Sequence, residues 1–182
     1  MEATVLNYDE MQSPIGPLVL AATDSGLCNI EFGAYKERQS RLQSWSARWF
    51  GDEALWQHNP PALADAVRQL EQYFAGERRS FELKLDMRGT PFQLKVWSEL
   101  CRIPYGETRS YKQIAEGIGN VKAVRAIGGA NHNNPVAIVV PCHRVIGAGG
   151  DMVGYGGGLP IKTFLLELEQ PAKVAGAAAN NG

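Results

Sequence analysis

The chain has 182 residues, of which 45% are hydrophobic and 20% charged, a composition typical of a globular protein with one large or two small domains. No apolar run approaches the roughly 20 residues that span a membrane, and no basic segment with an apolar core opens the chain, so neither a transmembrane helix nor a signal peptide is predicted. Three cysteines without framework spacing favour a reducing cytosol over a secreted disulfide scaffold. The net charge of −1 does not by itself indicate a nucleic-acid partner.

The N-terminal part of the chain predicts a small α/β unit. Short β-branched and alternating runs are separated by turn residues such as Ser13–Gly16, and one helix has a clear apolar stripe at Leu63, Val67, Leu70 and Phe74. The expected elements are strands at 4–8, 17–22, 27–32 and 81–85, helices at 35–50 and 62–75, a loop at 51–61 and a linker at 86–89. No residue here suggests chemistry, so we expect this unit to pack against and support the rest.

Two capping boxes open the next helices. Thr90 with Gln93 predicts one helix start, and Ser110 with Gln113 predicts a second. A glycine turn then leads to a short helix at 121–130. Two short helices joined by a tight turn have the outline of a helix-turn-helix, although many such pairs bind nothing.

The helix at 121–130 carries an unusual number of small residues around Arg125. They are Ala123, Ala126, Gly128, Gly129 and Ala130. Glycines weaken a helix by up to about 1 kcal/mol each, so either close helix packing or close approach to a nucleic acid must favour them. From residue 84 to residue 128 eight basic residues stand against four acidic ones, a local excess of +4 that also fits a solvated mixed surface.

Cys142 occupies the position expected of a nucleophile. The apolar run 136–140 predicts a buried strand, Pro141 ends it, and Cys142, His143 and Arg144 follow directly before a glycine turn. A thiol with an ordinary pKa of about 8.5 needs a base or a positive charge to react at neutral pH. A buried, inert cysteine is the commoner alternative. A metal site is not predicted, because the cysteines and histidines have no ligand spacing.

These residues and several other motifs resemble the O6-alkylguanine-DNA alkyltransferase family. The matching segments are Pro141–Ile146, Arg125–Ala130, Asn133–Pro135, Gly154–Gly158 and Leu165–Glu169. The resemblance is close over residues 88–170 and loose before them. It implies an α+β protein of two domains: an N-terminal α/β, ribonuclease H-like sheet domain at 1–86 and a mostly helical domain at 87–170. The latter would carry a winged helix-turn-helix-like DNA-binding motif, with a flexible tail at 171–182.

The resemblance also implies roles for four residues of the reaction. Cys142 would attack the alkyl carbon, Glu169 would orient His143, and His143 would take the thiol proton, through a water. Tyr111 would assist rotation of the target nucleotide, and Tyr111 or a nearby N–H would stabilise the departing guanine oxygen. Read alone, Tyr111 would be a packing residue and Glu169 a surface carboxylate.

DNA contact and the pocket follow from the same resemblance. The helix at 121–130 would enter the minor groove with Ala123, Ala126 and Gly128 against the DNA, and Arg125 would fill the stack left by a flipped base. The expected pocket residues are Asn134, Val145, Val153, Gly154, Tyr155 and Gly156. Gly156 stands where some relatives carry a larger hydroxylated residue, which predicts a pocket tolerant of groups beyond methyl.

The expected activity is a single, irreversible alkyl transfer from O6-alkylguanine, and from O4-alkylthymine, in double-stranded DNA. No cofactor is expected, and no zinc, because Cys28 is the only cysteine or histidine before His58. The expected state is a monomer, with cooperative binding to DNA left open, in the cytoplasm and on the nucleoid if the source is prokaryotic. Two other classes remain: a cysteine hydrolase, and a non-repairing sensor of alkylated DNA, which is a weak rival because such relatives lack the cysteine. A transcriptional regulator would more often read the major groove as a dimer, and the small residues of the helix at 121–130 argue against it.

Overall fold

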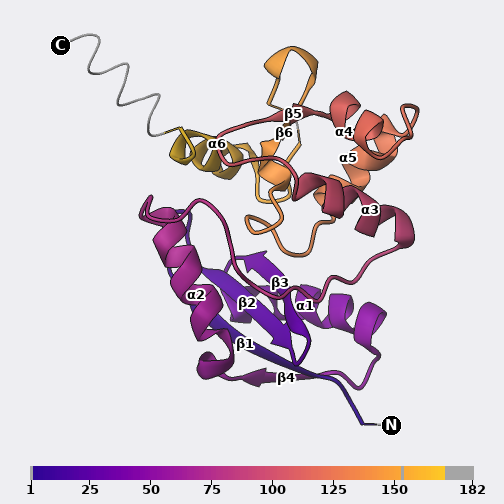
Figure 1. The fold of residues 1–182 in the computed structure, drawn as a ribbon. Coiled ribbons are helices and arrows are strands. Elements are labelled where there is room, and N and C mark those ends of the chain that lie inside the picture. Colours follow the sequence, from indigo (N-terminus) through magenta and orange to yellow (C-terminus); the bar gives the residue numbers. More distant parts are fainter. Residues whose placement is uncertain (1, 153, 171–182) are drawn as a thin grey trace, which may run out of the picture.

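The structure is a computed structural model that describes residues 2–152 and 154–170. An N-terminal sheet domain lies below a mostly helical C-terminal domain (Figure 1). The predicted two-domain α+β fold is therefore confirmed. Within the described residues, every helix is too short or too polar to cross a membrane.

A four-stranded mixed sheet, in the order β3-β2-β1-β4, forms the N-terminal domain. Its strands are β1 (Val5–Met11), β2 (Leu18–Thr23), β3 (Gly26–Phe32) and β4 (Leu55–His58). The first three are antiparallel neighbours, and β4 lies parallel to β1. The predicted turn between β1 and β2 closes through reciprocal backbone hydrogen bonds between Ser13 and Gly16, and Gly16 adopts a φ of +99° that favours glycine.

The strand β4 overturns the prediction of a continuous loop over 51–61. Leu55, Gln57 and His58 are exposed and only Trp56 is half-buried, so this short edge strand has no alternating pattern of burial to reveal it. Its pairing with β1 comes from tertiary contact rather than from local sequence preference.

Two helices cover opposite faces of this sheet, as Figure 1 shows: α1 (Tyr35–Phe50) and α2 (Pro60–Phe74). The stripe of α2 packs Leu63, Leu70 and Tyr73 into the main core. Trp45 and Phe50 of α1 pack instead on a small cluster on the other face. Both helices agree with the sequence prediction, except that α2 begins two residues earlier and ends one residue earlier.

The segment 81–85 is not the strand that its alternation predicted. Phe81, Leu83 and Leu85 do pack against the core, but only Leu85 pairs, in a single parallel bridge with Leu27. Backbone hydrogen bonds from Leu27 to Lys84 and from Asp86 to Leu27 complete that contact. The alternation of apolar and polar residues therefore reflects burial of one side of this segment, although the segment does not form the continuous hydrogen bonds of a strand.

The C-terminal domain contains four helices, a two-stranded parallel sheet and two short 3-10 turns. They are α3 (Pro91–Leu100), β5 (Arg109–Ser110), α4 (Tyr111–Gly117), α5 (Val124–His132), η1 (Cys142–Arg144), β6 (Val145–Ile146), η2 (Ala148–Gly150) and α6 (Leu159–Leu168). Both predicted capping boxes are present: Thr90 and Gln93 exchange hydrogen bonds of 2.9 and 3.1 Å, and Ser110 and Gln113 exchange bonds of 2.8 and 3.1 Å. The helix predicted at 121–130 begins three residues later and ends two residues later.

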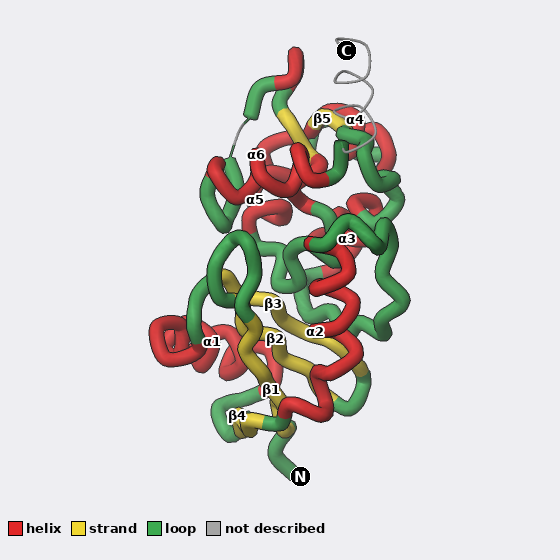
Figure 2. The backbone as a smooth tube through the Cα atoms, turned by 90° about the vertical axis from the view of Figure 1, so that its left-hand side faces the viewer, coloured by secondary structure: helices red, strands yellow, loops and turns green. Residues whose placement is uncertain are grey.

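One hydrophobic core runs through both domains. It joins Leu70 and Tyr73 of α2 to Leu100 of α3, Val136 and Leu165 of α6 without interruption. Figure 2 shows the same arrangement from the side, with the sheet and α2 below and α3 to α6 above. The N-terminal domain therefore forms part of the interior beneath the cysteine segment.

Candidate active site

Residues 136–140, which lead to Cys142, form a compact turn and not the predicted buried strand. Val136 makes one bridge with Ile30 of β3, and Ala137 makes one with Val140. Ile138 adopts a φ of +76°, a left-handed conformation that a β-branched residue rarely takes. A buried apolar run looks alike in sequence whether it is a strand or a turn, so its burial was predicted correctly and its backbone was not.

Two asparagines hold this turn and the cysteine that follows it. Asn134 donates from Nδ2 to the carbonyl of Val140 at 2.8 Å and accepts from the N–H of Val136 at 3.0 Å. Asn131 of α5 donates to the carbonyl of Cys142 at 3.2 Å. Asn134, predicted as a pocket residue, thus holds its own turn, while the link from α5 to the cysteine comes from Asn131, which was not singled out from sequence.

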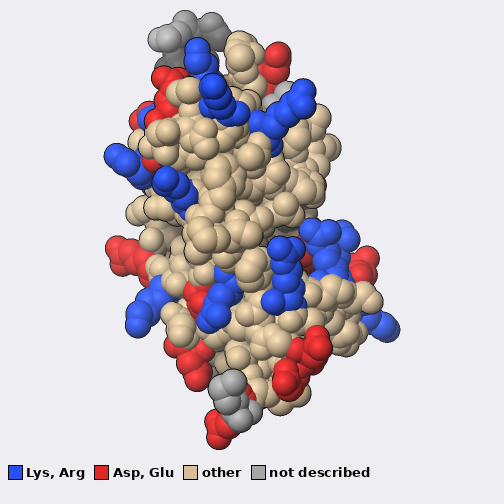
Figure 3. Space-filling model, turned by 90° about the vertical axis from the view of Figure 1, so that its right-hand side faces the viewer, with Lys and Arg blue, Asp and Glu red and all other residues tan. Residues whose placement is uncertain are grey.

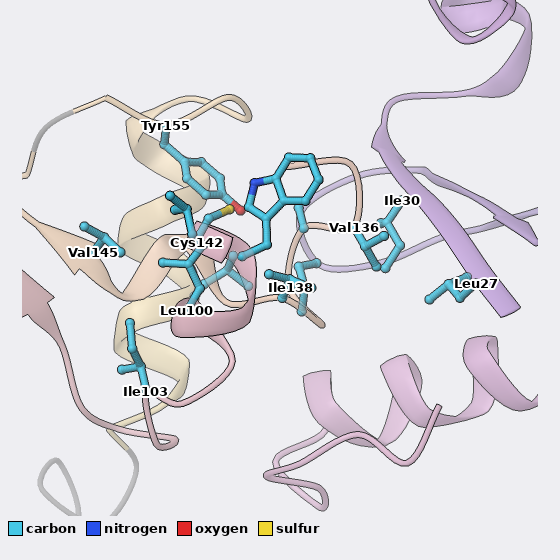
Figure 4. Close-up of a cluster of buried hydrophobic side chains, with 14 of the residues drawn as sticks. Leu27, Ile30, Leu100, Ile103, Val136, Ile138, Cys142, Val145 and Tyr155 are labelled. Atoms are coloured by element: carbon cyan, nitrogen blue, oxygen red, sulfur yellow. The ribbon is translucent and has the colours of Figure 1, made fainter. Parts of the chain in front are cut away.

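The Cys142 side chain is buried, with 4% of its surface exposed. Burial raises the pKa of its thiol, although a hydrogen bond with Asn134 and the charge of Lys162 act in the opposite direction. Figure 4 shows the Tyr155 hydroxyl next to the Cys142 sulfur. Because the resting side chain is a neutral thiol, its reaction needs a base to remove the proton.

His143, the next residue, has the neutral charge state that a base needs. Its Nε2 lies 2.7 Å from Oε2 of Glu169, and both side chains are buried. Burial lowers the pKa of His143, against the opposing effect of Glu169, so the imidazole is neutral near pH 7. The ionised Glu169 requires a proton on Nε2, which leaves Nδ1 as the acceptor. Nδ1 is buried and has no hydrogen-bond partner within the described part of the chain.

Glu169 is the junction of this network. It stands at the C-terminal end of α6, where the helix dipole disfavours a carboxylate. Burial raises its pKa, but the hydrogen bonds from His143 and Arg144, together with the charge of Arg144, outweigh burial and lower the pKa to about 2. Glu169 is therefore a buried, paired carboxylate and not the surface carboxylate that its position alone suggested.

Two further donors to Glu169 were missed from sequence. Arg144 donates from Nε to Oε1 at 2.8 Å and from Nη2 to Oε2 at 3.1 Å, and its Nη1 donates to the carbonyl of Ile103 at 2.7 Å. Tyr73 of α2 donates to Oε2 at 2.6 Å. The position of Arg144 after the Cys-His pair was a signal that sequence analysis left unused. Tyr73 gave no signal, because it occupies a core position of an amphipathic helix.

A cavity of about 330 Å³ opens beside Cys142 and is lined by both domains. Asn134, Tyr155 and Gly156 line it from the C-terminal domain, and Phe32 and Trp45 line it from the N-terminal domain. The rings of Phe32 and Tyr155 lie 5.9 Å apart between centroids. The N-terminal contribution to this wall was not expected from sequence.

The remaining predicted pocket residues differ in their surroundings. Val145 is buried, and its carbonyl accepts a hydrogen bond from Lys162. Gly154 is exposed, with a φ of +28°. Val153 lies outside the described residues.

The surface of α5 keeps its small residues open. Arg125 and Ala126 are exposed, Ala123 is half-buried, and a Cβ added at Gly128 or Gly129 would meet nothing within 4 Å. Close packing inside the described chain therefore does not account for these glycines. Figure 3 shows Lys and Arg side chains standing around a wide uncharged area in the upper, C-terminal half of the molecule.

Tyr111, the first residue of α4, lies near Cys142 and Asn131. It is half-buried, and its pKa is raised by burial and by the charge of a nearby Cys142 thiolate. A hydrogen bond with Asn131 acts against that rise. The structure thus brings Tyr111, Asn131 and Cys142 into one neighbourhood, with Arg125 further out on the open face of α5.

Family comparisons assign both halves of the chain. Residues 6–87 match the ribonuclease-like domain of 6-O-methylguanine DNA methyltransferase, and residues 91–171 match its DNA-binding domain. The chain belongs to the 6-O-methylguanine DNA methyltransferase family. The methylated-DNA–protein-cysteine methyltransferase of Methanosarcina barkeri is 49% identical over 163 residues, covering 90% of this chain and 96% of that protein. The corresponding protein of Mycobacterium leprae is 51% identical over 166 residues, covering 91% and 93%.

A solved structure of another methyltransferase shares the fold. The Mycobacterium tuberculosis OGT, crystallised in complex with DNA, superposes with a TM-score of 0.77 at 49% identity, covering 90% of this chain and 92% of that one. The family expected from the cysteine motif is therefore confirmed, and the methyltransferase fold contains the Cys-His-Glu arrangement described above.

Proposed function

We propose that this protein repairs alkylated DNA by moving the alkyl group from O6 of guanine to Sγ of Cys142. The observation that carries the proposal is a buried thiol beside a cavity, directly followed by a neutral histidine that Glu169 orients. Relatives at about half identity over most of their length are named methylated-DNA–protein-cysteine methyltransferases, which supports the same activity here.

The chemistry is a direct displacement. The thiol proton passes to Nδ1 of His143 through one bridging water, and the resulting thiolate attacks the alkyl carbon. A new S–C bond forms as the C–O6 bond breaks, and that electron pair goes to the guanine oxygen. The departing guanine then takes up a proton and is restored. Tyr111, close to the thiol, donates toward the departing base.

Each molecule acts once. The product is a thioether on Cys142, and none of the described side chains around the site can cleave an S–C bond. The reaction needs no cofactor, because the thiol is the acceptor and His143 holds the released proton. A cysteine hydrolase is disfavoured, because the relatives at about half identity over most of their length are named methylated-DNA–protein-cysteine methyltransferases.

We assign DNA contact to α5 in the minor groove. The open surface of Ala123, Ala126 and Gly128 allows close approach, and Arg125 is exposed without an ion pair or hydrogen bond among the described residues. Its guanidinium fills the stack when the damaged base rotates toward Cys142. O4-alkylthymine is the second substrate, because its alkyl group has the same chemistry. The protein acts as a monomer on cytoplasmic DNA, and on the nucleoid if its source is prokaryotic.

Mass spectrometry after mixing with a duplex carrying one O6-methylguanine tests the transfer. We expect one methyl group per protein, on the peptide that contains Cys142, and unmodified guanine in the DNA. Cys142→Ser is the matched control, which binds the duplex and leaves the lesion in place. A lesion that persists beside bound wild-type protein would indicate a sensor, and a lesion lost without modified Cys142 would refute the nucleophile assignment.

The DNA part of the proposal has a separate test. Arg125→Ala is expected to slow transfer from duplex DNA by about tenfold or more, while transfer from the free base O6-benzylguanine, which needs no flipping, stays unchanged. Arg68→Ala, which removes an exposed arginine on α2, is the matched control. If Arg125→Ala transfers from duplex DNA as fast as the wild type does, Arg125 has no role in base extrusion.

A further inference from the structure

The N-terminal domain reaches the catalytic network through one side chain. Tyr73 is fully buried on α2, and its hydroxyl donates to Oε2 of Glu169 at 2.6 Å. The two residues are separated by 96 positions in the chain and belong to different domains. Buried polar groups are normally paired, so the contact alone fits a structural role as well as a functional one.

The choice of oxygen distinguishes the two roles. Oε2 is the atom that lies 2.7 Å from Nε2 of His143, and it also accepts from Nη2 of Arg144 at 3.1 Å. Tyr73 therefore shares one carboxylate oxygen with the histidine that serves as base. Rotation of the carboxylate that broke the Tyr73 contact would also displace the acceptor of His143.

We propose that Tyr73 is a positioning residue of alkyl transfer, whose hydroxyl fixes the Glu169 oxygen that holds His143. This inference rests on the proposed function, because it assigns to Tyr73 a share in the proton transfer described there. The N-terminal domain then contributes to the chemistry itself, beyond the supporting role expected from its sequence.

The phenol can only act as a donor at this position. Burial and the adjacent Glu169 charge raise the pKa of Tyr73 far above its ordinary value, so its proton stays in place throughout the working pH range. A hydrogen bond donated to a carboxylate withdraws negative charge from it. Tyr73 therefore makes Glu169 a weaker partner for a protonated His143, and its loss should raise the pKa of the imidazole.

Other titratable and charged groups lie around the hydrogen bonds of Glu169 and also influence the pKa of His143. A test of Tyr73 must leave these groups unchanged. From η1 and α6 they are Cys142, Arg144 and Lys162, and from the surrounding loops they are Tyr105, Tyr155 and Arg79. Tyr105 offers a matched control. Its ring packs edge-on against Tyr73 at 6.3 Å, and its hydroxyl donates to the carbonyl of Leu168 at 3.3 Å, next to Glu169 but not to the carboxylate.

The experiment is single-turnover alkyl transfer with Tyr73→Phe and Tyr105→Phe across pH, using free O6-benzylguanine so that DNA contacts play no part. We expect Tyr73→Phe to lower the maximal rate about tenfold and to move the acid limb of the profile upward by about 0.5 pH unit. Tyr105→Phe should leave the limb in place. Both variants keep their rings, and thermal unfolding checks that they fold.

Replacement of Tyr73 by 3-fluorotyrosine, a stronger donor of nearly the same size, gives a second measurement with the opposite sign. The acid limb should then move to lower pH. An unchanged rate and limb in both Tyr73 variants would overturn the inference while leaving wild-type transfer to Cys142 intact. Absence of transfer in the wild-type protein would instead refute the proposed function.

Discussion

Arg144 grips the Glu169 carboxylate with two hydrogen bonds, from Nε to Oε1 at 2.8 Å and from Nη2 to Oε2 at 3.1 Å. Its third nitrogen, Nη1, donates a hydrogen bond to the carbonyl of Ile103 at 2.7 Å. One buried guanidinium therefore ties the cysteine turn to the end of α6 and to the segment after α3. A lysine has the same charge but cannot present this planar fork of donors.

Arg144→Lys is accordingly expected to destabilise the protein and to slow alkyl transfer. The lysine leaves buried acceptors unpaired, which costs about 1–3 kcal/mol in the free energy of unfolding. Urea unfolding and single-turnover rates measure the two effects. Arg109→Lys is the control, because its pair with Glu107 is partly exposed to solvent and its loss should change stability by less than about 0.5 kcal/mol. Equal effects of both substitutions would contradict the role of the fork.

Stability should fall in acid because of Glu169 and His143. Hydrogen bonds lower the pKa of folded Glu169 to about 2 from an ordinary 4.5, so its contribution is complete above pH 4.5 and is lost as pH falls toward 2. That contribution is about 3 kcal/mol. Burial depresses the pKa of His143 below 6.5, so below pH 6.5 protonation of this imidazole favours the unfolded state and stability falls further.

Urea unfolding of the wild type and of Glu169→Gln at pH 6, 4 and 3 separates these contributions. The wild type should lose stability between pH 4 and pH 3, and Glu169→Gln should lose clearly less over the same interval, since it has no carboxylate to protonate. Parallel pH profiles for the two proteins would mean that Glu169 is not ionised in the folded state.

Gly128 offers a separation of DNA binding from folding. A Cβ there meets nothing within 4 Å, so Gly128→Ala should stabilise the helix by up to about 1 kcal/mol. Gly128→Leu should fold equally well but bind duplex DNA at least about tenfold more weakly, because its bulk opposes close approach to the groove. Thermal unfolding and fluorescence anisotropy measure the two properties. Loss of stability without loss of affinity would place the glycine in folding instead.

The two glycines beside the cavity should behave differently when enlarged. At Gly156 a Cβ would lie 3.4 Å from the nearest atom, so Gly156→Ser is tolerated and narrows the cavity. We expect transfer of methyl to change little and transfer of benzyl to slow about tenfold, a size effect of the kind that hydrophobic pockets show. At Gly157 a Cβ would lie 2.9 Å from the rings of Phe32 and Tyr155, so Gly157→Ala should impair both transfers. If Gly156→Ser changes the rates of methyl and benzyl transfer by the same factor, Gly156 does not determine which alkyl groups the cavity accepts.

Local signals predicted the elements that local chemistry determines. Thr90 and Ser110 predicted the starts of their helices correctly, because both hydrogen bonds of a capping box form within four consecutive residues. The apolar stripe of α2 was equally visible, since a helix repeats its core contacts every turn. The family resemblance then supplied Cys142, His143 and Glu169, which the fold does bring together.

Long-range contacts remained invisible for physical reasons. Leu55 gives no sign of a strand, because the pairing of β4 depends on β1, about fifty residues earlier in the chain. Ile138 gave no warning of its left-handed backbone, which the surrounding packing imposes on a residue that disfavours it. Phe32 became a wall of the cavity only when the two domains met.

The uninterrupted core makes the two domains one thermodynamic unit although they are two units of sequence. One core contains residues of both domains: Leu70 and Tyr73 from the N-terminal domain, and Leu100 and Leu165 from the C-terminal domain. If the domains separated, these side chains would be exposed to water. Calorimetry should therefore record a single cooperative melting transition. A C-terminal fragment alone would expose the apolar face that α2 now covers and would leave Oε2 of Glu169 without its phenol. We therefore expect that neither domain folds or functions when it is separated from the other.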